Sequence, residues 1–484
     1  MLAFAQLGHA GIAMALVATA SLPQSLRSRF VTAGAAAGVT LSVLLALSGG
    51  DDQTWRTTLL TSEAATVVGL SGACAWLLVG LLDLGSGRWD QASLVGVSVS
   101  GLALFASNRW LVPGLIFWMC AALAVAVGIR TEGAGGWAGL AAALSDAAVV
   151  AVLVVHGIDR GEWGMPAPLS GWELYVVLGA AALRSGAFPG VGPFELTRYR
   201  AALAPVVIGG SFALLLRVGA RAEPWAGVAL LVVALAVAGW TVAQRDPARA
   251  AVASWPIALC LGAAYVAPGV VPGAAAAALV IATLVVLWPL SPGRGRAERG
   301  LVLTFAPATA GFVVIVGAAR AAFAHAVGAE GETASLAWTV AAALLPVTLA
   351  AGVVVGVRVA RQSEPRGYEP AAVVGTWVVF AAAIVLGLAI RAVLGISAEV
   401  LGPPERVLGL LVVALAAAAL AAYLAGRTRT PLPAHGRGDV FRLEVTTGWP
   451  RAARVASTTA PAITALALGA TLWLAYEGLR EGFL

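Results

Sequence analysis

Lysine is absent from this 484-residue chain, so all 30 basic side chains are arginines. Buried lysine changes its pKa readily and exchanges protons, whereas arginine keeps its charge because its pKa lies above about 12. The chain therefore lacks a side chain that proton-handling membrane proteins often use. Any proton path through it has to run through other groups.

Charge of either sign is scarce: charged residues make up 11% of the chain and hydrophobic residues 60%. The mean hydropathy is +0.90, which excludes a soluble globular protein. A transmembrane helix needs about 20 apolar residues, and roughly sixteen such segments are present. The sequence therefore predicts an all-α polytopic membrane protein with about 14–16 transmembrane helices. The expected spans are 3–22, 30–49, 63–83, 91–107, 110–129, 136–157, 171–189, 201–219, 225–242, 249–267, 274–290, 301–324, 335–357, 371–394, 406–425 and 456–476.

Arginine gathers in alternate loops, and acidic residues gather in loops on the other side. By the positive-inside rule the arginine loops are cytoplasmic, which places both termini outside the cell inner (plasma) membrane. The net charge of +6 then orients the helices and does not indicate nucleic-acid binding. No cleavable signal peptide is expected before the first span. The arginine loops include Arg27, Arg88, Arg130, Arg198, Arg245, Arg294, Arg358 and Arg427, and the acidic loops include Asp51, Asp159, Glu330 and Glu399.

Cysteine is nearly absent as well, with three residues far apart in apolar segments: Cys74, Cys120 and Cys260. They are typical of small buried hydrophobic residues and do not form a disulfide or metal framework. The sequence also has no paired nucleophile and base, no phosphate loop and no metal-ligand spacing. It therefore predicts no metal and no cofactor, and a stand-alone enzyme is the least favoured interpretation.

Two opposite charges lie inside predicted spans. Asp146 is near the centre of the sixth span, and Arg184 lies in the seventh. A charge in hydrocarbon is costly, so it normally faces a protein interior, a water-filled cavity or a partner. Adjacent antiparallel helices would bring these two together, and a pair costs far less than two lone charges. The pair is interpreted either as part of a proton path or as a static buried ion pair.

The other candidates lie mostly near span ends. We expect Arg320 to reach the membrane interface there, together with Arg217 and Arg391. For His156 and His325, a solvated or capping imidazole is favoured over a proton relay. His9 is the only histidine well inside a predicted span.

Two spans are broken by proline and glycine. One break, Phe188-Pro189-Gly190, directly follows Arg184, and the other runs from Pro307 to Gly311. Breaks in the bilayer are tolerated where they are buried or line a cavity. Paired interrupted helices are typical of inverted-repeat transporters, although both residue types are frequent in all membrane helices. We expect N-terminal helices over 1–90, antiporter-like repeats over 91–242 and 249–394, and C-terminal helices with a cytoplasmic loop over 395–484.

Several short motifs follow one another between about residues 60 and 330. They are Ser107-Asn108-Arg109-Trp110, Phe117-Trp118, Arg184 to Pro189, Phe212 to Arg217, Gln244 to Arg249, Pro289 to Gly293 and Pro307 to Phe312. In order and spacing this set resembles the antiporter-like superfamily of membrane subunits. That superfamily includes the large membrane subunits of respiratory complex I, multisubunit sodium/proton antiporters, membrane hydrogenases and two-component inorganic-carbon transporters.

Most of the proton-relay residues that this resemblance implies are replaced. The family's relay glutamate corresponds to Met119, and its relay lysines correspond to Arg184, Ile208, Ala248, Val285 and about Ile315. Gln244, Asp246 and Arg249 remain from the family's motif in the loop before the tenth span. Any surviving proton path would have to run through Asp146, His9 and water.

The membrane subunit of two-component inorganic-carbon transporters is the nearest branch. It is similar in having a tryptophan without the glutamate and Arg-Ser at the position of Arg184-Ser185. The resemblance implies a proton channel in the lipid bilayer that energises a soluble zinc-binding partner. Two alternatives stay open: a subunit of complex I (NADH–quinone oxidoreductase) or of a membrane hydrogenase, and a degenerate structural copy that conducts nothing. Each implies other subunits of a membrane complex as partners.

Overall fold

The protein is described here by a computed structural model, which covers residues 136–161, 171–188, 204–217, 222–243, 249–287, 309–328, 332–360 and 450–480, with isolated positions at 11–37, 112–127 and 169. Within these residues every regular element is a helix. Five helices are long and apolar enough to cross a membrane: Trp137–Arg160, Pro224–Val242, Gly311–Gly328, Ser335–Gly356 and Arg454–Arg480. The predicted all-α, multi-pass membrane architecture is therefore confirmed. The total of about 14–16 spans stays a prediction.

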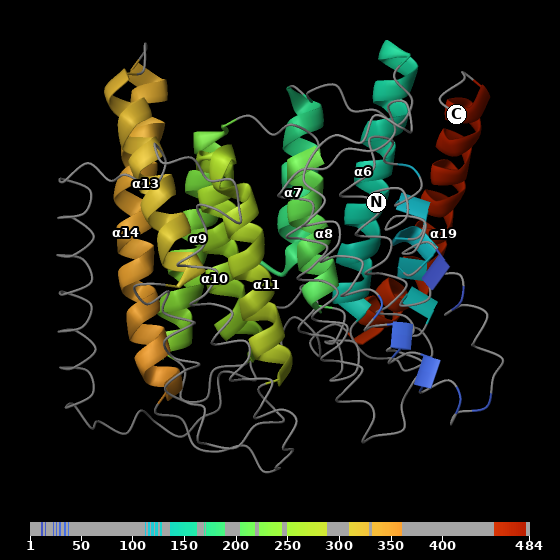
Figure 1. The fold of residues 1–484 in the computed structure, drawn as a ribbon, viewed down its shortest axis with the longest axis horizontal. Helices are drawn as coiled ribbons and strands as arrows, with labels where there is room; N and C mark the ends of the chain where they lie inside the picture. The colour runs from blue at the N-terminus through green and yellow to red at the C-terminus, as the bar shows by residue number, and fades with distance from the viewer. Residues whose placement is uncertain are drawn as a thin grey trace. The chain divides into compact units, whose positions relative to one another are not determined.

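The chain forms two compact units, and the first contains four of the described helices. These are α6 (Gly136–Arg160), α7 (Trp172–Ser185), α8 (Ala204–Arg217) and α19 (Pro450–Arg480). α6 packs against both α7 and α19, and α7 packs against α8 (Figure 1). The C-terminal helix therefore lies beside α6, although about 300 residues separate them in the sequence.

The second unit contains the remaining described helices. These are α9 (Pro224–Ala243), α10 (Arg249–Val266), the short 3₁₀ helix η5 (Pro268–Val270), α11 (Val271–Leu287), α13 (Ala310–Gly328) and α14 (Glu332–Ala360). α9 packs against α10 and α14, while α13 packs against α10, α11 and α14. α10 is thus central, and its buried run from Trp255 to Val266 reflects contact on all sides.

Glycine sets the close approach of α9 and α10. A Cβ atom added at Gly227 would overlap the Val266 side chain and would lie 3.0 Å from the carbonyl oxygen of Gly262. A Cβ at Gly262 would in turn lie 3.0 Å from the Leu231 side chain. Small residues at helix interfaces allow backbones to approach and van der Waals contacts to form, which drives helix association in membranes.

Several hydroxyl side chains inside the helices donate to a carbonyl of the helix that carries them. Thr241 Oγ1 donates to the carbonyl of Val237 at 2.7 Å, and Thr464 Oγ1 donates to that of Ala460 at 2.9 Å. Such bonds to the preceding turn remove the cost of a bare hydroxyl group in hydrocarbon. These residues are therefore part of ordinary transmembrane helices and are not candidates for a polar path.

The first predicted break coincides with the end of α7. The helix stops at Ser185, and Gly186 adopts a φ of 84°, the left-handed conformation with which glycine commonly ends helices. Ala187 and Phe188 follow without helical structure, while Pro189 and Gly190 lie outside the described residues. Near the second break, α13 begins at Ala310, so Gly311 is in its first turn and Pro307 lies outside the described residues. That these spans resume beyond their breaks stays a prediction.

The compact units group the helices differently from the predicted repeats. α9 belongs to the second unit, and residues 450–484 belong to the first, whereas the prediction places 225–242 in the first repeat and 395–484 in a separate C-terminal part. Packing groups helices by contact and a repeat groups them by internal symmetry. The repeat boundaries therefore stay a prediction.

Two expectations for residues near span ends are wrong: the solvated side chain of His156 and the position of Arg320 near a helix end. His156 is 1% exposed in α6 and is not solvated. Arg320 is the eleventh of the 19 residues of α13, because this helix continues to Gly328 beyond the predicted end at 324. Arg320 Nη1 is buried and donates to no acceptor among the residues that the structure describes. His325, by contrast, is exposed as expected, and it stacks on Trp338 with ring centroids 4.6 Å apart.

Of the three cysteines, Cys260 is fully buried in α10 and matches the prediction. Cys120 is exposed, so that prediction is wrong for it. Cys74 lies outside the described residues.

Candidate functional site

Asp146 and Arg184 meet between two antiparallel helices of the first unit. Asp146 lies near the middle of α6, and Arg184 is the penultimate residue of α7, which packs against α6. Arg184 Nη1 forms an ion pair with Asp146 Oδ1, with side-chain exposures of 12% and 1%. Ala180 and Ala181 of α7 line the cavity beside Arg184.

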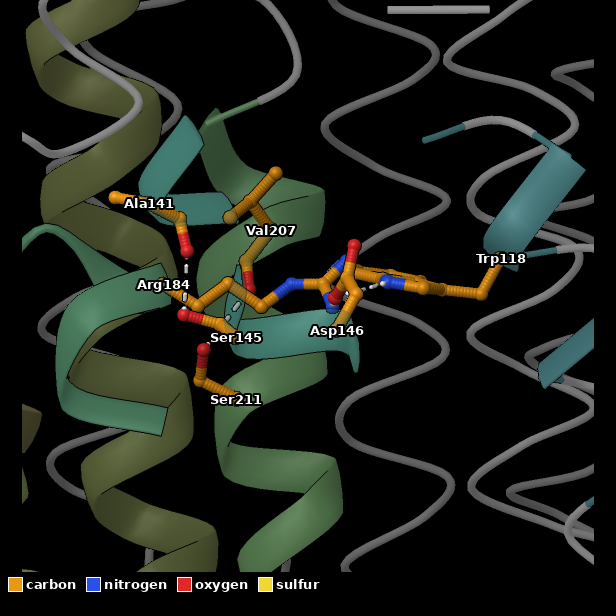
Figure 2. A network of polar contacts seen from close by, with 7 residues as sticks. All are labelled: Trp118, Ala141, Ser145, Asp146, Arg184, Val207 and Ser211. Atoms are coloured by element: carbon orange, nitrogen blue, oxygen red, sulfur yellow. Dashed lines mark hydrogen bonds and ion pairs between the residues drawn. The ribbon is translucent and has the colours of Figure 1, made fainter. Parts of the chain in front are cut away.

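Trp118 completes the site from a helical segment that precedes α6. Its indole Nε1 donates to Asp146 Oδ1 at 3.4 Å. The Arg184 guanidinium carbon lies 3.7 Å from the centroid of the Trp118 ring, which is cation–π geometry. Figure 2 shows the Arg184 side chain reaching toward both Asp146 and Trp118. One carboxylate oxygen therefore accepts two donors, and the guanidinium contacts both an anion and an aromatic face.

Gly210 on α8 holds the Trp118 ring in place. A Cβ atom added at Gly210 would overlap the far edge of the indole. Because that indole also contacts Arg184, it cannot move away without breaking the cation–π contact. The absence of a side chain at position 210 is thus a condition for the geometry of the ion pair.

A cavity of ≈ 30 Å³ adjoins the ion pair. A buried water needs about 10–15 Å³ of such space and two to four polar partners, so the cavity has room for about two waters. Asp146 Oδ2 and Arg184 Nε are buried and have no hydrogen-bond partner among the described residues. The lining residues are Leu115, Trp118, Met119, Ser145, Asp146, Val149, Ala180, Ala181, Arg184, Gly210 and Leu214.

Two serines lie near the ion pair on facing helices. Ser145 Oγ donates to the Ala141 carbonyl at 2.7 Å, and Ser211 Oγ donates to the Val207 carbonyl at 3.2 Å (Figure 2). A hydroxyl that donates to its own helix still has two lone pairs with which to accept. Ser145 lines the cavity and can therefore accept a hydrogen bond from water there.

The positions aligned with the family's lost relay residues are apolar wherever the structure describes their side chains. Met119 is fully buried and lines the cavity, and Ile208 in α8 and Ile315 in α13 are also fully buried. Val285 lies in α11 and Arg249 begins α10, and their side chains are not described. Gln244, Asp246, Ala248 and His9 lie outside the described residues.

A second cluster of charged groups, which the sequence did not point to, joins α6 and α7 further along. His156 Nδ1 lies 3.4 Å from Glu173 Oε1, and Arg160 Nη2 lies 3.7 Å from Glu173 Oε2. His156 and Glu173 are 1% and 7% exposed at their side chains, whereas Arg160 is 39% exposed. The sequence feature that could have indicated this cluster is Glu173, an acidic residue in the first turn of a predicted span. Acidic residues at such positions usually face water.

Within the described residues, no three side chains of histidine, cysteine, aspartate or glutamate gather as a metal site would require. The chemistry of the site is therefore that of a buried carboxylate, a permanent cation, an aromatic ring and space for water.

A comparison with family models found no match. A comparison with curated proteins also found none. Among solved structures, the chain is similar to a chain of respiratory complex I from Thermus thermophilus, determined with bound aureothin. The TM-score is 0.57 and the identity 20%, over 81% of this chain and 98% of that one. The chain therefore shares the fold of a chain of that complex, in agreement with the fold that the sequence resemblance implied.

Proposed function

We propose that this chain is a proton-conducting membrane subunit of a larger complex, and that Asp146 carries the proton. One observation carries the proposal. Asp146 is 1% exposed in a transmembrane helix, with Oδ1 held by Arg184 and Trp118 and Oδ2 at a cavity with room for water. A buried ionisable group within a membrane span is a functional-site candidate by default.

Asp146, Arg184 and Trp118 would each have a different part in proton transfer. Arginine does not release its proton near neutral pH, so Asp146 is the member of the pair that can be protonated. Once Asp146 is neutral, the Arg184 charge keeps its contact with the Trp118 ring, which stabilises the cation while the carboxylate is protonated. Water in the cavity would connect Asp146 Oδ2 to its proton donors and acceptors.

The partner of this subunit is proposed to be a soluble zinc-binding protein, as in two-component inorganic-carbon transporters. Trp118 without a following glutamate and the Arg184-Ser185 pair support this branch, through the sequence resemblance. The chain itself has no zinc-ligand spacing, so zinc chemistry would belong to the partner. The fold similarity to a complex I chain supports the alternative, a subunit of a redox-driven complex.

The closed ion pair favours a second candidate, a structural copy that conducts nothing. A paired, hydrogen-bonded carboxylate is stabilised in its charged form and resists protonation. Most relay positions are apolar, which agrees with such a copy. The two candidates differ in one property, which is proton flux.

The test is proton flux in proteoliposomes that contain this chain with its co-purifying partners, for the native chain and for Asp146→Asn. The substitution keeps the shape of the side chain and removes its proton exchange. We expect flux from the native complex and a loss of about 100-fold or more in the variant. Glu477→Gln is the matched control, because Glu477 pairs with Arg480 at 3.3 Å near the end of α19, outside the site.

Each result separates the candidates. Flux that disappears with Asp146→Asn and persists with Glu477→Gln supports the proposal. A native complex that assembles and conducts nothing supports the structural copy. The co-purifying protein decides between the branches: a zinc-binding soluble protein supports the inorganic-carbon branch, and quinone-oxidoreductase subunits support the alternative.

A further inference from the structure

The cluster of His156, Glu173 and Arg160 is a second acid–base site on the helix pair that carries the Asp146–Arg184 ion pair. His156 and Glu173 are nearly inaccessible, and their nearest polar atoms lie 3.4 Å apart. Burial of an ionisable pair is costly unless its members are mutually satisfied. A structural contact in a membrane helix does not need two titratable groups, so this pairing calls for a functional explanation.

The two sites follow the same seam between α6 and α7. Asp146 and His156 are ten residues apart on α6, a rise of about 15 Å. Glu173 and Arg184 are eleven residues apart on α7, and this spacing returns to nearly the same face of a helix after three turns. The contacts Asp146–Arg184 and His156–Glu173 thus lie at two depths along one interface.

The His156 end of the seam is also its connection to water. Arg160, in the last turn of α6, is 39% exposed while its guanidinium lies 3.7 Å from the buried Glu173 carboxylate. Asp159 beside it is exposed. Glu173 therefore has a buried histidine on one side and a solvated charged group on the other.

We propose that His156 and Glu173 form a proton-exchange site where the α6–α7 seam meets the membrane surface, passing protons between water and the path through Asp146. This inference rests on the proposed function, because it assigns an exit or entry point to the same path. Histidine suits this position, since one ring nitrogen can accept a proton while the other donates one. The ligand of the site is the proton itself.

In the proposed step, one proton enters at the His156 imidazole and one proton leaves from the Glu173 carboxyl group. In the starting state the neutral imidazole carries its proton on Nδ1 and donates it toward the Glu173 carboxylate. A proton arriving at Nε2 makes the imidazolium, and the Nδ1 proton then passes to Glu173 Oε1. This leaves a neutral imidazole protonated at Nε2 and a neutral carboxylic acid. Glu173 releases its proton to water beside Arg160. Water then carries the Nε2 proton of the ring to Nδ1, which restores the first tautomer, so that one proton has entered at Nε2 and one has left from Glu173.

The helices that pack at this site carry further charged groups. α6 contributes Arg160 and Asp159, and α7 contributes Glu173. α19 also packs against α6, and its Glu477 and Arg480 pair with each other at 3.3 Å. The groups in direct contact with the Glu173 carboxylate are thus His156 and Arg160.

The test measures proton flux against pH in proteoliposomes holding the full chain with its co-purifying partners. His156→Asn keeps an amide donor near the position of Nδ1 but cannot take up a proton. We expect flux to fall about tenfold or more, because the variant side chain cannot take up and release a proton. Glu173→Gln, which keeps the shape of the carboxylate but cannot exchange its proton, should give the same loss. His325→Asn is the matched control, because His325 is exposed and lies in the other unit.

The chain has four histidines, so ¹⁵N-histidine NMR supplies a readout that does not depend on flux. The resonance that His156→Asn removes should shift in Glu173→Gln, because the two side chains are in contact. Native flux that survives His156→Asn but not Asp146→Asn would overturn this inference and leave the proposed function standing. Equal losses in His156→Asn and His325→Asn would also overturn it. A native complex without flux would reject the proposed function and this inference together.

Discussion

At the scale of single residues, the Asp146–Arg184 pair determines what else the site contains. Both side chains are largely withdrawn from water, so each is the main compensation for burying the other. Trp118 contributes a hydrogen bond to the anion and an aromatic face to the cation. The result is a buried carboxylate that is stabilised in its charged form while one of its oxygens adjoins space for water.

A double-mutant cycle tests whether the pair interacts as the geometry indicates. Removing one partner leaves an uncompensated buried charge, so Asp146→Asn and Arg184→Gln should each destabilise the protein by about 3–5 kcal/mol. The double variant should lose less than either single variant, because neither charge is left alone. Thermal unfolding of the purified protein in detergent measures all three. Losses that simply add would mean that the two side chains do not interact.

The sequence singled out Asp146 and Arg184 because charges stand out against an apolar background. Trp118 could not be singled out in the same way, since aromatic residues are common in membrane spans and its contact with Asp146 joins residues 28 positions apart. The contact between His156 and Glu173 could not be predicted from the sequence for another reason. They lie near the ends of predicted spans, where water is the usual partner, and only the packing of α6 against α7 excludes it.

At the scale of the helices, the site depends on the close approach of α8. Gly210 receives the Trp118 ring, and any side chain at that position would displace it. The helices therefore fix the ion pair indirectly, through the tryptophan that contacts both charges. Gly210 thus affects the geometry of the ion pair although it has no side chain and makes no polar contact with the pair.

Gly210→Ala should displace Trp118 and loosen the Arg184 contact. Overfilling a packed interior costs about 1–3 kcal/mol, and we expect a loss of this size together with reduced proton flux. Gly179→Ala in α7 is the matched control, because a Cβ there meets nothing within 4 Å. Thermal unfolding and flux of the two variants give the comparison. Equal behaviour of the two variants would contradict the proposed function of Gly210 as a support for Trp118.

The sequence predicted the presence of the helices correctly, but it predicted their first and last residues less accurately. Long apolar stretches bounded by arginines placed α6, α9, α14 and α19 within a few residues of their observed positions. α13 was placed too early, because apolar residues extend on both sides of Pro307 and hydropathy alone does not show where the helix begins. Arg320 was therefore assigned to a span end and lies in the middle of a helix.

At the scale of the whole molecule, the two compact units contain a similar detail. Trp118 lies against Gly210 in the first unit, and a Cβ at Gly352 of α14 would likewise overlap the ring of Trp255 in α10. By the predicted span order these pairs join the fifth to the eighth span and the tenth to the thirteenth. The shared offset of five spans supports the predicted repeats, whose boundaries stay a prediction.

The fold class was predictable from composition, because no soluble protein needs so much apolar surface. The shared fold with a complex I chain agrees with motifs that are weak one by one and informative in their order. Function was less predictable, since the residues that would define it by resemblance are mostly replaced. Proton conduction is therefore inferred from one buried carboxylate and its surroundings.

The most direct measurement is infrared difference spectroscopy of the reconstituted complex while a proton gradient is applied and removed. The account predicts a carboxylic-acid band that appears as Asp146 takes up a proton and that is missing in Asp146→Asn. The control variant Glu477→Gln should keep the band. A native complex that transports protons without any such band, or with a band that survives Asp146→Asn, would contradict the claim that Asp146 carries the proton.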